Sequence, residues 1–390
     1  MSTTQSIHSF LTAELDHYLS DLRTLAAIDS GPHDKTGANR VNDWLAGRLQ
    51  ALGFTVTRQP HEKVGDTLQA TLTGSGTVKI LLLGHSDTVF PAGTAAARPV
   101  TIDGPKLLGP GTCDMKAGLL TGLYAIAALQ QISFEEFGTL TYLCVADEEL
   151  PTRWSVPDIR AAVRGQDAVL TLEAARENGD IVTARKGNAV LRITAHGHSA
   201  HAGVEPEKGR NAILGLARRL DEVAATARPA DGITVTLSLI NGGSMTNVVP
   251  DRAEAALDIR SFDNAGLEAT RARIEAIFDR PDPAGIQFSL TYEAVSPPMP
   301  RTPAIAHLER LAQLAADELG FTVHGASTGG AADAAFAAEA GVPALDGLGP
   351  IGGLDHSPDE YILLDSIVPR TAMLARLLML IAAAHTGGTN

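Results

Sequence analysis

The sequence predicts an α/β fold with a mostly parallel central sheet flanked by helices, plus an inserted ferredoxin-like α+β domain. Short apolar runs alternate with segments of helical periodicity, which is typical of an α/β layer. Acidic and imidazole side chains follow several of these runs directly. From about residue 184 the order changes to strand-helix-strand-strand-helix-strand, which is the order of a ferredoxin-like layer.

The chain has 390 residues, which is long enough for two domains. We expect one domain to comprise residues 1–183 and 297–390, with the second domain, 184–296, inserted between its two parts. The Pro-rich segment 296–300 marks the return to the first domain.

In the first domain, apolar residues recur either at helical spacing or in short β-type runs. Polar loops and glycines such as Gly53 mark the boundaries between them. The expected helices cover about 7–27, 39–52, 119–129, 156–163 and 304–319, with a last helix after residue 367, and the expected strands cover 54–57, 67–73, 78–83, 139–146, 167–172 and 343–345.

The second domain has its own expected elements, which form one sheet with one helical face. The expected strands cover 188–195, 233–239, 253–260 and 287–292, and the expected helices cover 211–224 and 267–278.

Side chains with catalytic potential stand where the strands of the first domain end. In open α/β sheets, ligands bind beyond the carboxyl ends of the strands. Asp114 follows a Gly/Pro-rich turn just before a helical run, where a carboxylate is well placed to hold a cation. The residues that follow strands are His85, Asp87, Glu148, Glu149 and Glu173.

The residue types in this set indicate metal chemistry. His85 and Asp87 are two positions apart, so in extended backbone they point the same way, and the carboxylate can fix the tautomer of the imidazole. A mixed nitrogen and oxygen set without thiolate suits zinc, cobalt or manganese. Of Glu148 and Glu149, one can bind metal while the other acts as general base. Each residue alone is more often a surface pair or a solvated turn charge; the shared placement carries the hypothesis.

Composition excludes several other classes of function. A net charge of −14 argues against electrostatic attraction to nucleic acid or to an anionic membrane. Two cysteines, Cys113 and Cys144, do not make a disulfide scaffold. The N-terminus lacks a signal-peptide pattern, so we expect a cytoplasmic protein. The apolar run 374–384 is too short to span a bilayer and is interpreted as a core helix.

A series of motifs, in order along nearly the whole chain, resembles the co-catalytic metallopeptidases of the M20 type. The likeness is greatest to their glutamate carboxypeptidase (carboxypeptidase G2-like) branch. The motifs are GHSDTV at 84–89, GPGTCDMKAG at 109–118, ADEE at 146–149, LEAA at 172–175, RKG at 185–187, HSAHAG at 198–203, GRNA at 209–212, NVVPD at 247–251, TGGAADA at 328–334 and DHSPDE at 355–360.

The resemblance implies two zinc ions, with cobalt or manganese as substitutes. One ion would be held by His85, Asp114 and Glu173. The other would be held by Asp114, Glu149 and His356. Glu148 would then be the general base and Asp87 the orienting partner of His85. The family often has a cis peptide after the bridging aspartate, here between Asp114 and Met115.

The resemblance also gives the second domain a role in dimerisation and in closing over the substrate. His201 would reach the neighbouring active site and support the oxyanion. The implied substrate-binding residues are Asn247, Arg260, Gly329, Gly330 and Gly353. Without the family, His201 is one residue of a polar loop, a structural ion pair explains Arg260 equally well, and the two adjacent glycines are more often a plain turn.

Three departures from the family pattern leave the substrate open. Leu150-Pro151-Thr152-Arg153-Trp154 follows the acidic turn where the family usually offers Gly-Ser. Ala174-Ala175 follows Glu173 where proline is common, and Ala331-Ala332 stands where a hydroxyl residue is frequent.

The function predicted from the sequence is metal-dependent hydrolysis of the amide bond of N-acyl amino acids or short peptides with a free C-terminal carboxylate. We expect a homodimer that acts on a small molecule. An acetylornithine or succinyl-diaminopimelate type of deacylase is the neighbouring alternative. A non-catalytic metal-binding protein is another, although it would not need the free base Glu148. A serine hydrolase is a third, but the sequence has no G-x-S-x-G elbow.

Overall fold

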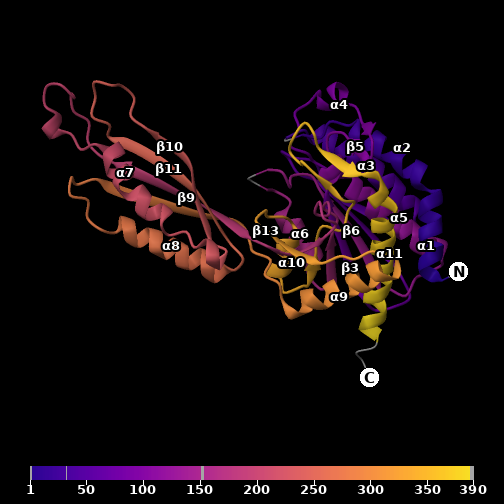
Figure 1. Ribbon diagram of the computed structural model, residues 1–390. Coiled ribbons are helices and arrows are strands. Elements are labelled where there is room, and N and C mark those ends of the chain that lie inside the picture. Colours follow the sequence, from indigo (N-terminus) through magenta and orange to yellow (C-terminus); the bar gives the residue numbers. More distant parts are fainter. Residues whose placement is uncertain (1, 32, 151–152, 387–390) are drawn as a thin grey trace. The chain divides into compact units, whose positions relative to one another are not determined.

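The computed structural model describes residues 2–31, 33–150 and 153–386, and it contains two compact units (Figure 1). Unit 1 consists of the described residues of Met1–Ala184, Arg301–Ser327 and Ala332–Asn390. Unit 2 consists of Arg185–Pro300 and Thr328–Ala331. The sequence departure at Pro151 and Thr152 lies outside the described residues.

The main sheet of unit 1 has six strands in the order β1-β2-β6-β3-β7-β14. Strand β3 runs parallel to β6 and β7, and β14 runs parallel to β7, while β2 is antiparallel to both β1 and β6. The predicted α/β class with a mostly parallel sheet is therefore confirmed, and β2 is the strand that reverses. The bounds are β1 (Thr55–Gln59), β2 (Thr67–Thr73), β3 (Lys79–His85), β6 (Thr139–Val145), β7 (Ala168–Thr171) and β14 (Ala344–Leu345).

Helices flank this sheet. Helix α5 is buried along most of its length, and α11 packs against it and against α9 and α1. The sequence-based helix over 7–27 is two helices, α1 and α2, because the backbone turns at Glu14, where φ is −88° and ψ is 0°. The helices of unit 1 are α1 (Thr3–Ala13), α2 (Leu15–Ala26), α3 (Lys35–Ala51), α4 (Thr94–Ala97), α5 (Ala117–Gln131), α6 (Val156–Val163), α9 (Pro303–Glu318), α10 (Ala334–Glu339) and α11 (Ile367–Thr386).

The C-terminal segment Leu364–His385, which contains α11, is long and apolar enough to cross a membrane by length and composition alone. Most of its apolar window is buried inside the protein, where α11 contacts α5 and α9. This burial is what a core helix requires.

A buried arginine ties α11 to the loops beside the main sheet. Arg370 is 1% exposed, and its guanidinium donates to the carbonyls of Gly349 at 3.1 Å, Gly179 at 2.9 Å and Gly347 at 2.5 Å. Its removal leaves these buried carbonyls without their charged donor.

We expect Arg370→Met to lower the free energy of unfolding by about 3–5 kcal/mol, measured by urea denaturation. The control is Arg376→Met on the same helix, which breaks a partly exposed pair with Glu318 and should cost less than about 1 kcal/mol. Equal losses for the two variants would contradict this role of Arg370.

A small antiparallel sheet in unit 1, in the order β15-β16-β5-β4, was not predicted from the sequence. Its strands are too short for a periodicity to appear: β4 (Thr101–Asp103), β5 (Lys106–Leu108), β15 (Gly352–Gly353) and β16 (Tyr361–Leu363). It brings the turn that follows β5 next to the loop between β15 and β16. Two further short strands, β8 (Ile181–Arg185) and β13 (Gly325–Thr328), form a separate pair.

Unit 2 is a four-stranded antiparallel sheet in the order β10-β11-β9-β12, which is the order of a ferredoxin-like layer. Alternate residues of β9, such as Leu191 and Ile193, are buried in a core shared with α7 and α8. The elements are β9 (Gly187–His196), α7 (Ala212–Ala224), β10 (Thr234–Gly242), β11 (Arg252–Ser261), α8 (Asn264–Phe278) and β12 (Gln287–Ser296).

Candidate active site

Three neighbouring parallel strands deliver acid and imidazole groups to one edge of the main sheet. His85 ends β3, the pair Glu148 and Glu149 follows β6, and Glu173 follows β7. Because these strands are parallel, their carboxyl ends lie at the same edge. Asp114 comes from a short turn, Thr112–Lys116, just before α5, and its peptide bond to Met115 is cis, as the resemblance implied.

The side chains converge on the carboxylate of Asp114. His85 Nε2 lies 3.0 Å from Asp114 Oδ1 and 3.6 Å from Glu173 Oε1. His356, from the loop between β15 and β16, lies with Nε2 3.1 Å from Asp114 Oδ2 and 3.2 Å from Glu149 Oε2. The two oxygens of Asp114 thus face different histidines, which is the geometry a bridging carboxylate needs.

Asp87 connects the imidazole to the acidic turn. His85 Nδ1 lies 3.0 Å from the backbone oxygen of Asp87, so Nδ1 carries the proton and Nε2 faces the cluster. The Asp87 carboxylate accepts the backbone N–H groups of Glu148 at 3.2 Å and Glu149 at 3.0 Å. His85 and Asp87 are both buried, so their mutual orientation is well defined.

The packed carboxylates require positive charge. Burial raises the pKa of Glu148, Glu149 and Glu173, and with the nearby charge of Asp114 it brings the pKa of Glu173 to about 7. Hydrogen bonds to Asp114 and Glu149 raise the pKa of His356 to about 11. Burial disfavours the charged form of His85, yet hydrogen bonds to surrounding carboxylates raise its pKa well above the ordinary value. The same negative surroundings would stabilise divalent cations.

The donor set fits a metal ion. Ligand atoms of His85, Asp114 and Glu149 lie within 4.8 Å of one another. Glu149 Oε1 is buried and has no hydrogen-bond partner among the described residues, although a buried carboxylate oxygen ordinarily has one. Nitrogen and oxygen donors without thiolate match the preferences of zinc, cobalt and manganese.

Sequence reasoning missed one carboxylate of this cluster. A second group of ligand atoms within 4.8 Å of one another joins Asp355 to Asp114 and His356. The signal available in the sequence was that Asp355 directly precedes His356.

Sequence reasoning also missed Glu360, which holds the turn that carries Asp114. Its carboxylate is 1% exposed and accepts the backbone N–H groups of Gly111 at 2.9 Å, Cys113 at 2.8 Å and Asp114 at 3.0 Å. It touches no metal-ligand atom directly, so we regard it as a positioning residue for Asp114.

We expect Glu360→Gln to weaken metal affinity about 10–100-fold, because the amide puts N–H donors against backbone donors and frees the turn. Calorimetric zinc titration measures this. The neighbouring exposed residue provides the control, and Asp359→Asn should bind zinc like the wild type. Unchanged affinity in Glu360→Gln would contradict the positioning role.

A second buried network fixes the other end of the acidic turn. Asp147 is fully buried and accepts the backbone N–H groups of Trp154 at 2.5 Å and Ser155 at 3.0 Å. Arg153 donates to the Asp147 carbonyl at 3.1 Å and forms a two-pronged ion pair with buried Asp333. The turn that carries Glu148 is therefore held from both sides.

Five of the predicted residues belong to unit 2. His201 and Asn247 are exposed on adjoining loops, where the Ala202 N–H donates to the Asn247 carbonyl at 2.9 Å. Nδ1 of His201 accepts the Gly203 N–H at 3.1 Å. This bond leaves Nε2 available.

The predicted carboxylate-binding groups of unit 2 already have hydrogen-bond partners within that unit. Arg260 pairs with Asp258 at 2.8 Å and 3.2 Å and donates to the Gly329 carbonyl at 2.7 Å. The Gly330 carbonyl accepts from Arg185 at 3.1 Å. Gly353, by contrast, belongs to unit 1 and lines a pocket beside Asp114 and Glu173.

The chain resembles known hydrolases over most of its length. Residues 81–380 match the family model Peptidase family M20/M25/M40. Carboxypeptidase G2 of Pseudomonas sp. (strain RS-16) is 29% identical over 94% of this chain and 90% of the relative. Succinyl-diaminopimelate desuccinylase of Methylorubrum extorquens is 29% identical over 86% of this chain and 92% of the relative.

The fold is likewise shared with solved structures. Aminopeptidase PepT from Bacillus cereus ATCC 10987 superposes with a TM-score of 0.80 at 22% identity, covering 94% of this chain and 99% of that one. The agreement of motif order, site chemistry, family model and fold leads to one conclusion. The chain is a metal-dependent hydrolase and belongs to peptidase family M20/M25/M40.

Proposed function

We propose that the enzyme hydrolyses the amide bond of N-acyl amino acids or short peptides whose C-terminal carboxylate is free. The observation that carries the proposal is the convergence of the five proposed ligand side chains beside Glu148. In the described part of the chain, the Glu148 carboxylate forms no hydrogen bond with Asp114 or His356. The similarity to carboxypeptidase G2 supports this substrate class.

Two divalent ions fit the ligand set. His85, Asp114 and Glu173 would hold one, and Asp114, Glu149 and His356 would hold the other. When bound, such ions polarise the scissile carbonyl and lower the pKa of an attacking water toward ~7.

Glu148 is the proposed general base. Its backbone N–H is anchored on Asp87 and its carboxylate is half-buried at the sheet edge. One carboxylate oxygen takes a proton from the attacking water and delivers it to the amide nitrogen, so that the C–N bond breaks and the amine leaves.

Unit 2 would complete the site. His201 would donate to the oxyanion, a contribution worth about 3–4 kcal/mol for a well-placed donor. Asn247 would assist it. Arg260, with the backbone of Gly329 and Gly330, would bind the substrate carboxylate after releasing its present partners, and Gly353 would line the site from unit 1.

We propose a homodimer formed through unit 2. Strand β10 is an edge strand of its sheet and carries exposed apolar side chains, Leu237, Leu239 and Ile240, with exposures of 41%, 57% and 54%. An exposed apolar edge strand can pair with a strand of another chain through its unpaired backbone N–H and C=O groups. An isologous pairing of two such edges would bury these side chains in a closed dimer.

The double variant Leu239→Lys/Ile240→Lys is expected to be monomeric by light scattering, because it puts like charges into the edge pairing. The control is Leu314→Lys in unit 1, where the leucine is 45% exposed on α9. A wild-type monomer, or a dimer that survives the double substitution, would contradict pairing through β10.

If His201 serves the partner's site, two inactive variants should complement each other. Mixing His201→Ala with Glu148→Ala should restore up to about a quarter of wild-type activity, since half of randomly formed dimers are mixed and each has one complete site. No recovery after subunit exchange would place His201 in its own subunit's site or outside catalysis.

The central test is a release assay over a panel of N-acyl amino acids, with metal analysis on the same sample. Chelation should abolish amide cleavage, and zinc or cobalt should restore it. A deacylase of the succinyl-diaminopimelate type is the second candidate, favoured by the similarity to succinyl-diaminopimelate desuccinylase. The same panel of substrates separates this candidate from the first. Full activity after complete metal removal would overturn both.

A further inference from the structure

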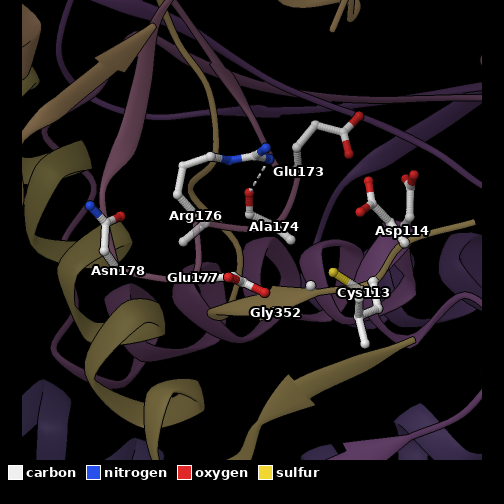
Figure 2. Close-up of a pocket in the computed structure, with 12 residues that line it drawn as sticks. Cys113, Asp114, Glu173, Ala174, Arg176, Glu177, Asn178 and Gly352 are labelled. Carbon is white, nitrogen blue, oxygen red and sulfur yellow. Dashed lines mark hydrogen bonds between the residues drawn. The ribbon is translucent and has the colours of Figure 1, made fainter. Parts of the chain in front are cut away.

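A pocket of about 510 Å³ lies within unit 1, next to the proposed metal ligands. Three segments line it: residues 113–114, 173–178 and 352–355 (Figure 2). Asp114 and Glu173 form part of its wall, so a group attached to the reacting carbonyl can extend into it. Its volume suits a small organic group.

One arginine, Arg176, lines the pocket. Arg176 donates from Nη2 to the Ala174 carbonyl at 3.2 Å, and within the described ranges it has no ion pair with a carboxylate. Its Nε is buried and has no hydrogen-bond partner there. Arg153, Arg160 and Arg260, in contrast, all pair with acids. A partly buried guanidinium with free donors is a site for an anion.

The backbone presents Arg176 at a defined place. The Arg176 N–H donates to the Asp180 carbonyl at 3.0 Å, and the Gly179 N–H donates to the Arg176 carbonyl at 2.7 Å. This tight turn follows β7 directly, so the arginine comes from the same segment as Glu173.

Two acids of the pocket, Glu177 and Asp355, lie outside the proposed ligand set. Glu177 Oε1 accepts from the Tyr361 hydroxyl at 3.4 Å. Asp355 belongs to the group with Asp114 and His356. Figure 2 shows Arg176 and Asn178 on the side of the pocket away from Cys113 and Asp114. The Asn178 amide donates to the Asp180 carboxylate at 2.7 Å, so the cationic donor in the region distant from Asp114 is the Arg176 guanidinium.

We propose that this pocket takes the acyl part of the substrate and that Arg176 binds a carboxylate at the far end of that acyl group. The substrates would be amides of dicarboxylic acids, with one carboxyl in the scissile bond and the other free. Arg176 would then be a specificity-determining residue. This inference rests on the proposed function for the orientation of the substrate.

Binding of the free acids tests the inference without turnover. Calorimetry on the zinc-loaded enzyme compares succinate and glutarate with their monoamides, succinamate and glutaramate, which have the same shape but lack the second charge. We expect the diacids to bind about 10–100-fold more tightly, and Arg176→Gln to reduce this ratio to near one. Arg176→Lys should retain part of it. The control is Arg164→Gln at an exposed position, which should keep the wild-type ratio.

Turnover gives a second readout. The kcat/KM ratio of N-succinyl-glutamate over N-succinamoyl-glutamate should fall in Arg176→Gln by the same factor as the binding ratio. The inference is overturned if the wild-type enzyme binds the diacids no more tightly than their monoamides. It is also overturned if Arg176→Gln keeps the wild-type zinc content and the wild-type ratio of diacid to monoamide affinity. An Arg176-dependent preference for diacids without cleavage of any acyl amino acid supports the pocket assignment and overturns the proposed function instead.

Discussion

Glu148→Gln is expected to lower kcat by about 10²–10⁴-fold while the metal content stays at the wild-type level. The amide keeps the size of the side chain but cannot accept the proton of the attacking water. The backbone of residue 148 remains anchored on the Asp87 carboxylate, so the geometry of the turn is preserved. Steady-state kinetics and metal analysis on one preparation measure both quantities.

The neighbouring residue is the matched control for this experiment. Glu149 Oε2 lies 3.2 Å from His356 Nε2, so Glu149→Gln should lose metal as well as activity. A Glu148→Gln enzyme with near wild-type kcat would remove the general-base assignment. A Glu148→Gln enzyme that has lost its metal would make Glu148 a ligand instead.

Asp114→Ala should lose both of the proposed metal ions and lower activity by at least about 10³-fold, because each of its oxygens faces a different histidine. The metal analysis is the more informative measurement. His85→Ala, in contrast, removes a donor from one ion only and should keep close to half of the metal. Asp359→Asn, at an exposed position outside the cluster, should keep most of it.

Asp114→Ala with one ion still bound would show that the two sites do not share this carboxylate. Loss of all metal in His85→Ala would indicate that the two ions bind as one cooperative unit. Circular dichroism should accompany each variant, so that unfolding is not mistaken for loss of metal.

Much of the candidate site could be predicted from the sequence because its groups follow strands. A buried parallel strand appears as an apolar run, and its carboxyl end follows in the next residue or two. His85, Glu149 and Glu173 could therefore be assigned to one edge of a sheet before the strand order was known. The order of the motifs indicated the family that the comparisons confirm.

The remaining contacts depend on pairings that no local pattern contains. Glu360 and Cys113 are 247 residues apart in the chain, and strands of two or three residues bring them together. Such strands are too short for an alternation to be recognised. The bonds of Arg260 to Asp258 and to the Gly329 carbonyl likewise depend on where the chain folds back on itself.

The sequence by itself determined the α/β class, the family and the residue types available for metal binding, because periodicity and motif order are local properties of the chain. Only the tertiary structure decided that each oxygen of Asp114 faces a different histidine, that Glu360 holds the turn, and that Arg176 lines a pocket with unused donors. These features arise from contacts between distant segments, whose geometry is set by packing and hydrogen bonding across the whole unit.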